Sequence, residues 1–453
     1  MKIIIVGAGI GGLSAALALA LEKHSVTVLE SAPQLAEIGA GVQLTPDAIK
    51  FFFRWGLRDD IVAKAAVPGT FFIHHWKDGR VLGSVDARGL EGEYGAPYVV
   101  VHRGVLHDIL HRHAVRAGAE VRVDSRVVEY DFERGAVVLR GGRRIEADLV
   151  VACDGINSFA RTQFLKEQDR GAQKTGWAAY RTMIDVSSIK ANPLTADLVE
   201  RHNNHLWIGE NCSAMTYMIY ESTKLNMVLS HRDDVDTTTW TPAQYHGVIQ
   251  SLFRGWDGKL TALLDMVSPE TINNWPVYQV EPLPRWVSKS GKFVLMGDAA
   301  HAMAFYLSMG ISMAVEDAVA LAECLSLLGS ATSSSSTTDP NDNDTNEPGR
   351  KPKPSLSTAI GLFESVRKPR AEAVQSASLH AGEILHLPPS TAQEKRDALL
   401  QADGRTDSKD DRQYVYGIAD RETRDWCYGY DAALGTRRAW EELFGPANRE
   451  TGI

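Results

Sequence analysis

Cysteine is scarce in this chain, and its copies are scattered. They stand at Cys153, Cys212, Cys324 and Cys427, and no two of them form a C-x-x-C pair. Neither a disulfide framework nor a zinc site is indicated, so we expect no bound metal. This cysteine usage favours a reducing compartment.

Long apolar runs and an excess of positive charge are also missing. No uninterrupted apolar stretch approaches the roughly 20 residues that a membrane span needs, and the first expected strand begins at residue 2, which leaves no room for a signal segment. A formal net charge of −9 argues against nucleic acid or an anionic membrane as partner. We therefore expect a cytoplasmic protein of two or three domains, and the sequence leaves its oligomeric state open.

The first thirty residues, in contrast, contain several signals in succession: a strand, a glycine-rich turn, a helix and a second strand. Lys2–Val6 is a β-branched run, and the next six residues, GAGIGG, fit G-x-G-x-x-G directly before a helical stretch rich in Ala and Leu. Gly9 leaves room for a pyrophosphate, and Gly12 lets the helix pack closely on the strand. Glu30, at the end of a second strand, is placed to bind ribose hydroxyls and would repel a 2′-phosphate. The stretch predicts a site for FAD or NAD rather than NADP.

Three further positions point to the same nucleotide. Arg103 stands at a strand-to-helix junction, from which its guanidinium can reach the phosphates. Asp154 ends an apolar strand, and ligands gather at the carboxyl ends of parallel strands. The glycines that lead to Gly41 indicate backbone close to something flat or bulky.

The middle of the chain has a different pattern of apolar and polar residues. Between residues 176 and 275, alternating apolar and polar residues predict an antiparallel sheet. A later segment of Ser, Thr, Asp, Asn and Pro predicts a disordered surface insertion. We divide the chain into a discontinuous nucleotide domain (1–70, 98–170 and 285–329), a substrate domain (71–97 and 171–284), the low-complexity insertion (330–357) and a C-terminal helical region (358–453).

Three motifs in this order and spacing resemble the single-component FAD-dependent monooxygenases of the aromatic hydroxylase class, most closely the salicylate-hydroxylase-like branch. They are the glycine turn with Glu30, Asp154-Gly-x-x-Ser-x-x-Arg161, and Gly297-Asp-Ala-Ala-His301. The similarity covers nearly the whole chain outside the insertion. It implies an α/β fold: a Rossmann-like FAD-binding domain of the glutathione-reductase type, with an inserted antiparallel β-sheet substrate domain and C-terminal helices.

The same resemblance implies roles along the cofactor. The glycine turn and Glu30 would bind the ADP half of FAD, Arg103 the pyrophosphate, and Asp298 the ribityl-phosphate region. The further FAD-binding positions that it implies are Gly9, Gly12, Gly41, Val42, Asp154, Gly310 and Ile311. NAD(P)H is implied as a transient co-substrate, since the family has no second Rossmann domain and this chain has no second G-x-G-x-x-G.

The implied reaction is hydroxylation of an aromatic, phenolic or other electron-rich small molecule with NAD(P)H and O2, through a flavin C4a-hydroperoxide. A phenol is activated by a cation or a base that favours its phenolate. Arg181 and Tyr217 match the positions of the catalytic arginine and tyrosine in related fungal phenol-dearomatising oxygenases. Gln43, Phe305 and Met309 are expected to line the substrate pocket.

Departures from the family pattern gather near this expected active site. Phe305 stands where a proline is usual, Met309 where a glutamine is usual and Ser213 where a histidine is usual, and an Asp-Arg pair becomes Gln279-Val280. One account is a monooxygenase with a more apolar pocket for a bulky substrate of secondary metabolism. A second is that oxygen activation has been lost and FAD serves a redox-neutral or other step. A third is a flavin-free binding protein, like the dissociation inhibitors of small GTPases, although such a scaffold needs neither the glycine set nor its acidic partners.

Overall fold

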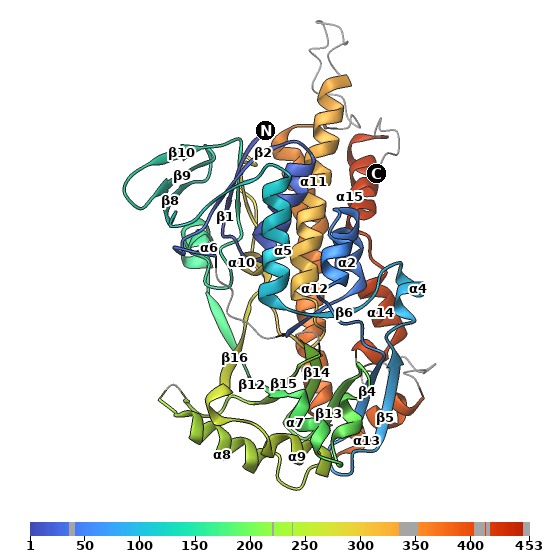
Figure 1. Cartoon of the computed structure of the whole chain (residues 1–453). Helices are drawn as coiled ribbons and strands as arrows, with labels where there is room; N and C mark the ends of the chain where they lie inside the picture. Colours follow the sequence, from blue (N-terminus) through green and yellow to red (C-terminus); the bar gives the residue numbers. More distant parts are fainter. Residues whose placement is uncertain are drawn as a thin grey trace, which may run out of the picture.

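The computed structural model describes residues 1–35, 41–219, 222–237, 239–334, 352–402, 413 and 417–446 of the chain. A parallel sheet with its helices occupies one end of the molecule, and a seven-stranded sheet occupies the other (Figure 1). The long helices α11 (Gly310–Ser334) and α12 (Leu356–Leu385) stand along the first end, and α12 extends to the second sheet.

The parallel sheet grows from the glycine-rich N-terminus. The strands β1 (Lys2–Val6) and β2 (Ser25–Leu29) pair in parallel across α1 (Ile10–Leu21), as the sequence predicts. The sheet order is β17-β11-β1-β2-β7. Its other strands are β7 (Glu120–Arg122), β11 (Leu149–Ala152) and β17 (Phe293–Leu295). Because β1, β11 and β17 are parallel neighbours, the turns that follow them meet at one edge of the sheet.

Helices cover this sheet and explain its apolar strands. α1 packs against α5 (Arg103–Arg116) and α11. Smaller elements flank this core: α2 (Pro46–Arg54), α3 (Arg58–Val62), α4 (Leu90–Tyr94), α6 (Phe159–Leu165), η1 (Lys166–Gln168), the ribbon of β3 (Gly41–Leu44) and β6 (Val99–His102), and the sheet of β8 (Val127–Asp131), β9 (Ala136–Leu139) and β10 (Arg144–Glu146). Strands covered on both faces are almost wholly apolar.

The second sheet has the order β16-β12-β15-β14-β13-β4-β5. Its strands are β4 (Thr70–His75), β5 (Val81–Asp86), β12 (Ala172–Asp185), β13 (Asn204–Gly209), β14 (Cys212–Ile219), β15 (Lys224–Arg232) and β16 (Asn273–Val280). The pairing is antiparallel, as expected, except that β13 runs parallel to β4. This parallel pair joins a hairpin from early in the chain to strands made much later.

One face of the second sheet is covered by short helices. They are α7 (Val186–Ala191), η2 (Ala196–Val199), α8 (Pro242–Leu252), α9 (Gly258–Asp265) and η3 (Pro269–Thr271). Their apolar residues form one core with alternate residues of the strands, including Trp207 and Met218. The other face, which carries Met215 and Tyr217, turns toward the parallel sheet.

The C-terminal helical region contains the long helix α12, and the helix α11 runs into the start of the predicted insertion. α11 continues to Ser334, past the domain boundary expected at residue 329, and the hydroxyls of Ser330 and Thr332 donate to carbonyls one turn back (3.1 and 3.0 Å). The part of the predicted insertion between 335 and 351 lies outside the described residues. The remaining elements are α10 (Asp298–His301), α13 (Thr391–Gln401), η6 (Gly417–Ala419), α14 (Arg421–Tyr428) and α15 (Ala432–Phe444).

The described ranges confirm the predicted α/β fold class with its antiparallel-rich second sheet. Within them, no helix combines the length and apolar character that crossing a bilayer requires. The same ranges contain no group of three or more His, Cys, Asp or Glu side chains arranged to hold a metal ion.

Candidate functional site

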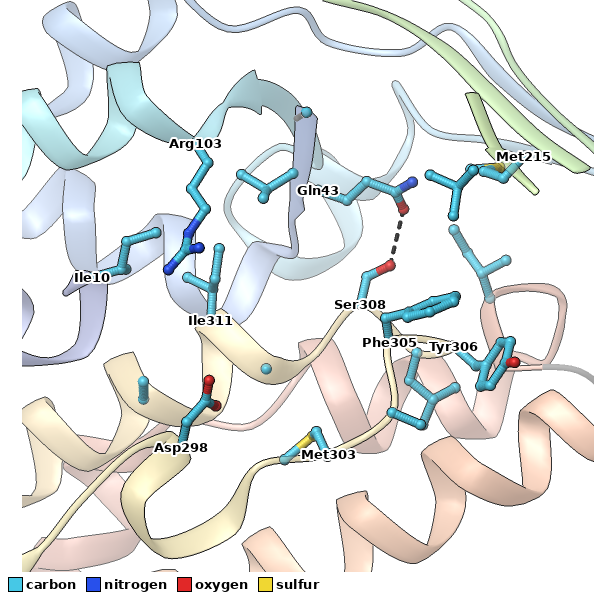
Figure 2. A pocket seen from close by; sticks show the side chains of 18 of the residues that line it. Ile10, Gln43, Arg103, Met215, Asp298, Met303, Phe305, Tyr306, Ser308 and Ile311 are labelled. Carbon is cyan, nitrogen blue, oxygen red and sulfur yellow. Dashed lines mark hydrogen bonds between the residues drawn. The ribbon is translucent and has the colours of Figure 1, made fainter. Parts of the chain in front are cut away.

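A cavity of about 450 Å³ lies between the two sheets. It has a polar end beside the glycine turn and an apolar end beside the seven-stranded sheet. Figure 2 shows Arg103, Ile10 and Asp298 around the first end and Phe305, Tyr306 and Met215 around the second. The cavity therefore joins the nucleotide-binding motif to the sheet that the sequence assigns to the substrate.

The glycine turn at the polar end is shaped by backbone contacts. Gly7 has a φ of +101°, and a β-carbon there would lie 2.4 Å from the carbonyl oxygen of Cys153. A β-carbon at Gly12 would lie 2.0 Å from the carbonyl oxygen of Gly7. At Gly9 no atom of the described chain lies within 4 Å of the same position, and Gly9 lines the cavity. Two glycines permit close packing, and the third leaves space beside the N-terminus of α1.

The two acidic residues predicted beside the turn, Glu30 and Asp154, accept hydrogen bonds from nearby backbone amides. Glu30 accepts hydrogen bonds from the Ala8 and Ala32 amides (2.9 and 2.8 Å) and does not line the cavity. Asp154 accepts from the Ser158 hydroxyl (2.5 Å) and from the Ala160 amide (3.0 Å), so its carboxylate caps α6. Their roles in FAD binding stay predictions. The neighbours of Asp154, rather than its side chain, face the cavity.

Arg103 and Asp298 face the cavity from opposite sides of its polar end (Figure 2). Arg103 is the first residue of α5, and Asp298 begins α10 after the turn at Gly297. Desolvation raises the pKa of Asp298 above its usual range, while electrostatic interactions with His301 and Arg103 act in the opposite direction. The polar end of the cavity therefore presents Arg103 and the N-terminus of α1, which suit a phosphate, and Asp298, which suits hydroxyl groups.

A buried charge network supports α10 from behind. Asp317 accepts hydrogen bonds from the Gly297 amide (3.0 Å), from His301 (2.6 Å) and from Arg367 (2.8 Å). Burial alone would raise the pKa of Asp317, but His301 and Arg367 lower it to about 2. Arg367 also pairs with Glu316 (2.5 Å). Of these residues, Gly297 and His301 belong to a motif noted in the sequence, but nothing in that motif revealed the pairing.

The ribbon strand β3 leads from the polar end to the centre of the cavity, where Gly41, Val42 and Gln43 all line it. A β-carbon at Gly41 would lie 2.6 Å from the ring of Tyr217, whose hydroxyl donates to the Gly41 carbonyl (2.7 Å). Gly41 therefore lets the second sheet approach the ribbon.

Gln43 is held in the centre by two hydroxyl groups. Its Oε1 accepts hydrogen bonds from Ser308 (3.0 Å) and from Tyr98. The bond to Ser308 is drawn in Figure 2. Tyr98 and Ser308 are pocket residues that sequence reasoning missed, because both partners come from distant parts of the chain.

Met309 does not reach the cavity, contrary to expectation. It is fully buried, and its sulfur accepts a hydrogen bond from the Thr45 hydroxyl (3.6 Å). The preceding residue, Ser308, has a φ of +57°, in the left-handed region that non-glycine residues rarely adopt. This turn presents Ser308 to the cavity and Met309 to the core. Gly310 and Ile311, which follow, do line the cavity.

Arg181 and Tyr217 meet at the start of the apolar end. The guanidinium of Arg181 lies 5.9 Å from the ring centre of Phe305. Its Nε is buried without a hydrogen-bond partner, and Arg181 has no carboxylate partner among the described residues. Burial raises the pKa of Tyr217 to about 12, although Arg181 and Gln43 act in the opposite direction. The protonated Tyr217 side chain therefore lies near the Arg181 guanidinium, which has no carboxylate partner among the described residues.

A row of side chains continues across the sheet from Arg181. Strand pairing places Arg181 opposite Val228, Val228 opposite Met215 and Met215 opposite Leu206. All four line the cavity. The apolar end therefore has one cationic edge and a wall of aliphatic side chains.

Comparison with known proteins agrees with this geometry. The model of the family described as FAD binding domain matches residues 1–344. The FAD-dependent monooxygenase OpS4 of Beauveria bassiana is 30% identical, with 95% of each chain covered, and the 3-hydroxybenzoate 6-hydroxylase of Polaromonas naphthalenivorans is 30% identical over 72% of this chain and 79% of its own. A salicylate hydroxylase in a substrate complex has the same fold, with a TM-score of 0.73, 21% identity and coverage of 97% and 98%. The resemblance read from the sequence is confirmed.

Proposed function

Because this chain belongs to the FAD binding domain family and is similar along its length to an FAD-dependent monooxygenase, we propose that it hydroxylates an aromatic, polycyclic phenol with NAD(P)H and O2. One oxygen atom of O2 enters a C–H bond of the substrate, and the other leaves as water. NAD(P)H gives up a hydride, and solvent supplies one proton. Bound FAD supplies the electron transfer and the oxygen activation. The protein binds the cofactor, excludes water and orients the phenol.

The residues at the polar end fit FAD. The open space beside Gly9, at the N-terminus of α1 and next to Arg103, suits a pyrophosphate. Asp298 would accept hydrogen bonds from the ribityl hydroxyls, and the backbone at Gly310 and Ile311 would face the flavin ring. Glu30 already accepts the Ala8 amide within the glycine turn, so its carboxylate lies next to the region where a ribose would sit.

The observation that carries the proposal is the unpaired guanidinium of Arg181 beside apolar walls. A cation in a pocket of low polarity attracts a phenolate oxygen more strongly than one in water, so it favours the reactive, electron-rich form of a phenol. Tyr217, whose pKa of about 12 keeps it protonated, donates to the Gly41 carbonyl rather than acting as a base. Tyr217 would therefore orient the phenol and the ribbon, while Arg181 supplies the charge.

The aliphatic wall of Leu206, Met215 and Val228 supports a substrate larger than one ring, of the kind that secondary metabolism produces. These side chains extend the cavity away from Arg181 along the sheet. Phe305, which replaces an expected proline, adds aromatic surface on the opposite side.

The proposal is tested with the purified, FAD-loaded protein. We would measure oxidation of NADH and NADPH in the presence of 18O2 and a panel of phenols of one to three rings. The expected result is ligand-stimulated oxidation and a product that carries a single 18O atom.

Three outcomes would contradict the proposal. If a bound ligand stimulates NAD(P)H oxidation but only hydrogen peroxide forms, oxygen transfer is lost. If no bound ligand stimulates oxidation or gains oxygen, the redox-neutral account is favoured. A protein that stays colourless after incubation with FAD would support a flavin-free scaffold.

A further inference from the structure

Two serines stand at the far end of the cavity, beyond the aliphatic wall. Ser213 on β14 and Ser230 on β15 are directly opposite each other in the strand register, and both line the cavity. They are almost fully buried, with 4% and 2% of their surfaces exposed. Polar residues in such a place need hydrogen-bond partners.

Each serine has one partner, and each partner comes from outside the sheet. The hydroxyl of Ser213 lies 2.8 Å from Nε2 of His386, which follows α12 and stacks on Trp177. The hydroxyl of Ser230 lies 2.9 Å from the hydroxyl of Tyr306. Burial lowers the pKa of His386 to about 3, so its imidazole is neutral. The two hydroxyls are therefore held in fixed positions by uncharged groups.

The serines keep hydrogen-bonding capacity for a ligand. A hydroxyl has one donor and two acceptor sites, and each serine side chain uses one of these sites within the described residues. Apolar side chains form the adjoining wall, so a polar ligand atom that reaches this end would find the two serines as its recognition groups.

The position of the serines sets the length of the ligand. Tyr217 and Ser213 lie on the same face of β14, four residues apart, which corresponds to about 13 Å along a strand. Tyr217 marks the cofactor side, because its hydroxyl contacts Gly41 and Gly41 pairs with His102, the residue before Arg103. In the strand register Arg181 is two strands away from Met215, and Met215 lies two residues from Ser213. At the usual sheet spacings the Cα atoms of Arg181 and Ser213 are therefore about 12 Å apart, a span that two linked or fused rings fill.

We propose that Ser213 and Ser230 form a second recognition site, which selects substrates of two or more rings that carry a hydroxyl or carbonyl group at the end remote from the hydroxylated ring. This inference rests on the proposed function and specifies its substrate class. The phenolic oxygen lies beside Arg181, the rings lie on the aliphatic wall, and the remote oxygen exchanges hydrogen bonds with the serines.

The test compares two probes, 4,4′-dihydroxybiphenyl and 4-hydroxybiphenyl, which differ only in the remote hydroxyl. Their dissociation constants are measured with the FAD-loaded protein by the change in flavin fluorescence, at a pH where both phenols are neutral. We expect the dihydroxy probe to bind at least about tenfold more tightly to the wild-type protein. In Ser213→Ala/Ser230→Ala this ratio should fall to about one, with little change for 4-hydroxybiphenyl.

Thr216→Val is the matched control, because Thr216 lies on the same strand but on the opposite face, and it should keep the wild-type ratio. The single variants S213A and S230A test the site if the double variant does not fold. Equal affinity of the wild-type protein for the two probes, including no binding of either, would overturn the inference. So would an unchanged ratio in the serine variants. Because binding is measured without turnover, a preserved ratio in a protein that forms no oxygenated product would refute the proposed reaction alone.

Discussion

The two ends of the cavity are built by different means. At the polar end, glycines and backbone amides form the surface, and each glycine stands where a β-carbon would either collide or protrude into the cavity. At the apolar end, side chains from the second sheet form the surface, and they meet across strands that are far apart in sequence. Backbone shape requires particular residues at fixed spacing, whereas a side-chain surface can be rebuilt by substitution. This explains why the cofactor motifs are intact while two of the departures, Phe305 and Ser213, line the substrate end.

The largest effect is expected behind the polar end, in Arg367→Met. Arg367 is fully buried between two carboxylates, and its removal leaves Glu316 with Arg370 and Asp317 with His301 as the remaining partners of a buried, negatively charged pair. The free energy of unfolding should fall by about 3 to 5 kcal/mol in denaturant titrations. Lys368→Met is the control, since the neighbouring Lys368–Glu372 pair (2.7 Å) is partly exposed and should contribute less than about 1 kcal/mol.

The same network gives a pH signature. Because the folded pKa of Asp317, about 2, lies below its unfolded value, its stabilising contribution is complete above about pH 4 and is lost as the pH falls toward 2. R367M should show a shallower loss of stability over this window. Equal losses in R367M and K368M, or unchanged acid sensitivity, would contradict the role given to the network.

The glycine turn offers a sharper comparison within the polar end. Gly12→Ala places a methyl group 2.0 Å from the Gly7 carbonyl oxygen and should destabilise the protein by about 3 kcal/mol. Gly9→Ala meets no described atom within 4 Å, so its unfolding free energy should change by less than about 0.5 kcal/mol. Its affinity for FAD should nevertheless fall at least about tenfold, because the methyl group enters the cavity. If both variants lose stability equally, the distinction between packing and cofactor glycines is wrong.

At the apolar end, Arg181→Met should act on turnover rather than stability. Removal of the cation should lower kcat/KM for a phenol by about 10- to 100-fold, the range of one charged hydrogen bond. Arg181→Lys should retain part of the activity, and raising the pH toward the pKa of the free phenol should partly restore R181M. A variant with unchanged kcat/KM would remove Arg181 from the mechanism.

The smallest effect is expected for Tyr217→Phe. The variant loses the hydrogen bond to the Gly41 carbonyl, which should lower stability by about 1 kcal/mol and turnover by less than about tenfold. Because the pKa of Tyr217 is about 12, Tyr217 should not titrate below pH 10. The pH–activity profiles of the wild-type protein and Y217F should therefore have the same shape in that range. The appearance of a difference between the two pH profiles would mean that Tyr217 acts as a base.

The contrast between the two ends also explains what the sequence could predict. The strand, glycine turn and helix at the N-terminus follow from local patterns and were predicted closely. The orientation of Met309 was not, because it depends on the left-handed backbone at Ser308. The contact of Ser213 with His386 joins residues 173 positions apart, so no local pattern marks it.

The parallel pairing of β4 with β13 has a consequence for the order of folding. The β4–β5 hairpin is complete at Asp86, but its neighbour in the sheet begins only at Asn204. During synthesis, the edge of β4 that pairs with β13 therefore stays without its partner until the ribosome has produced more than a hundred further residues. The second sheet can close only as a late, long-range event, and the pocket that it completes forms after the glycine turn has been made.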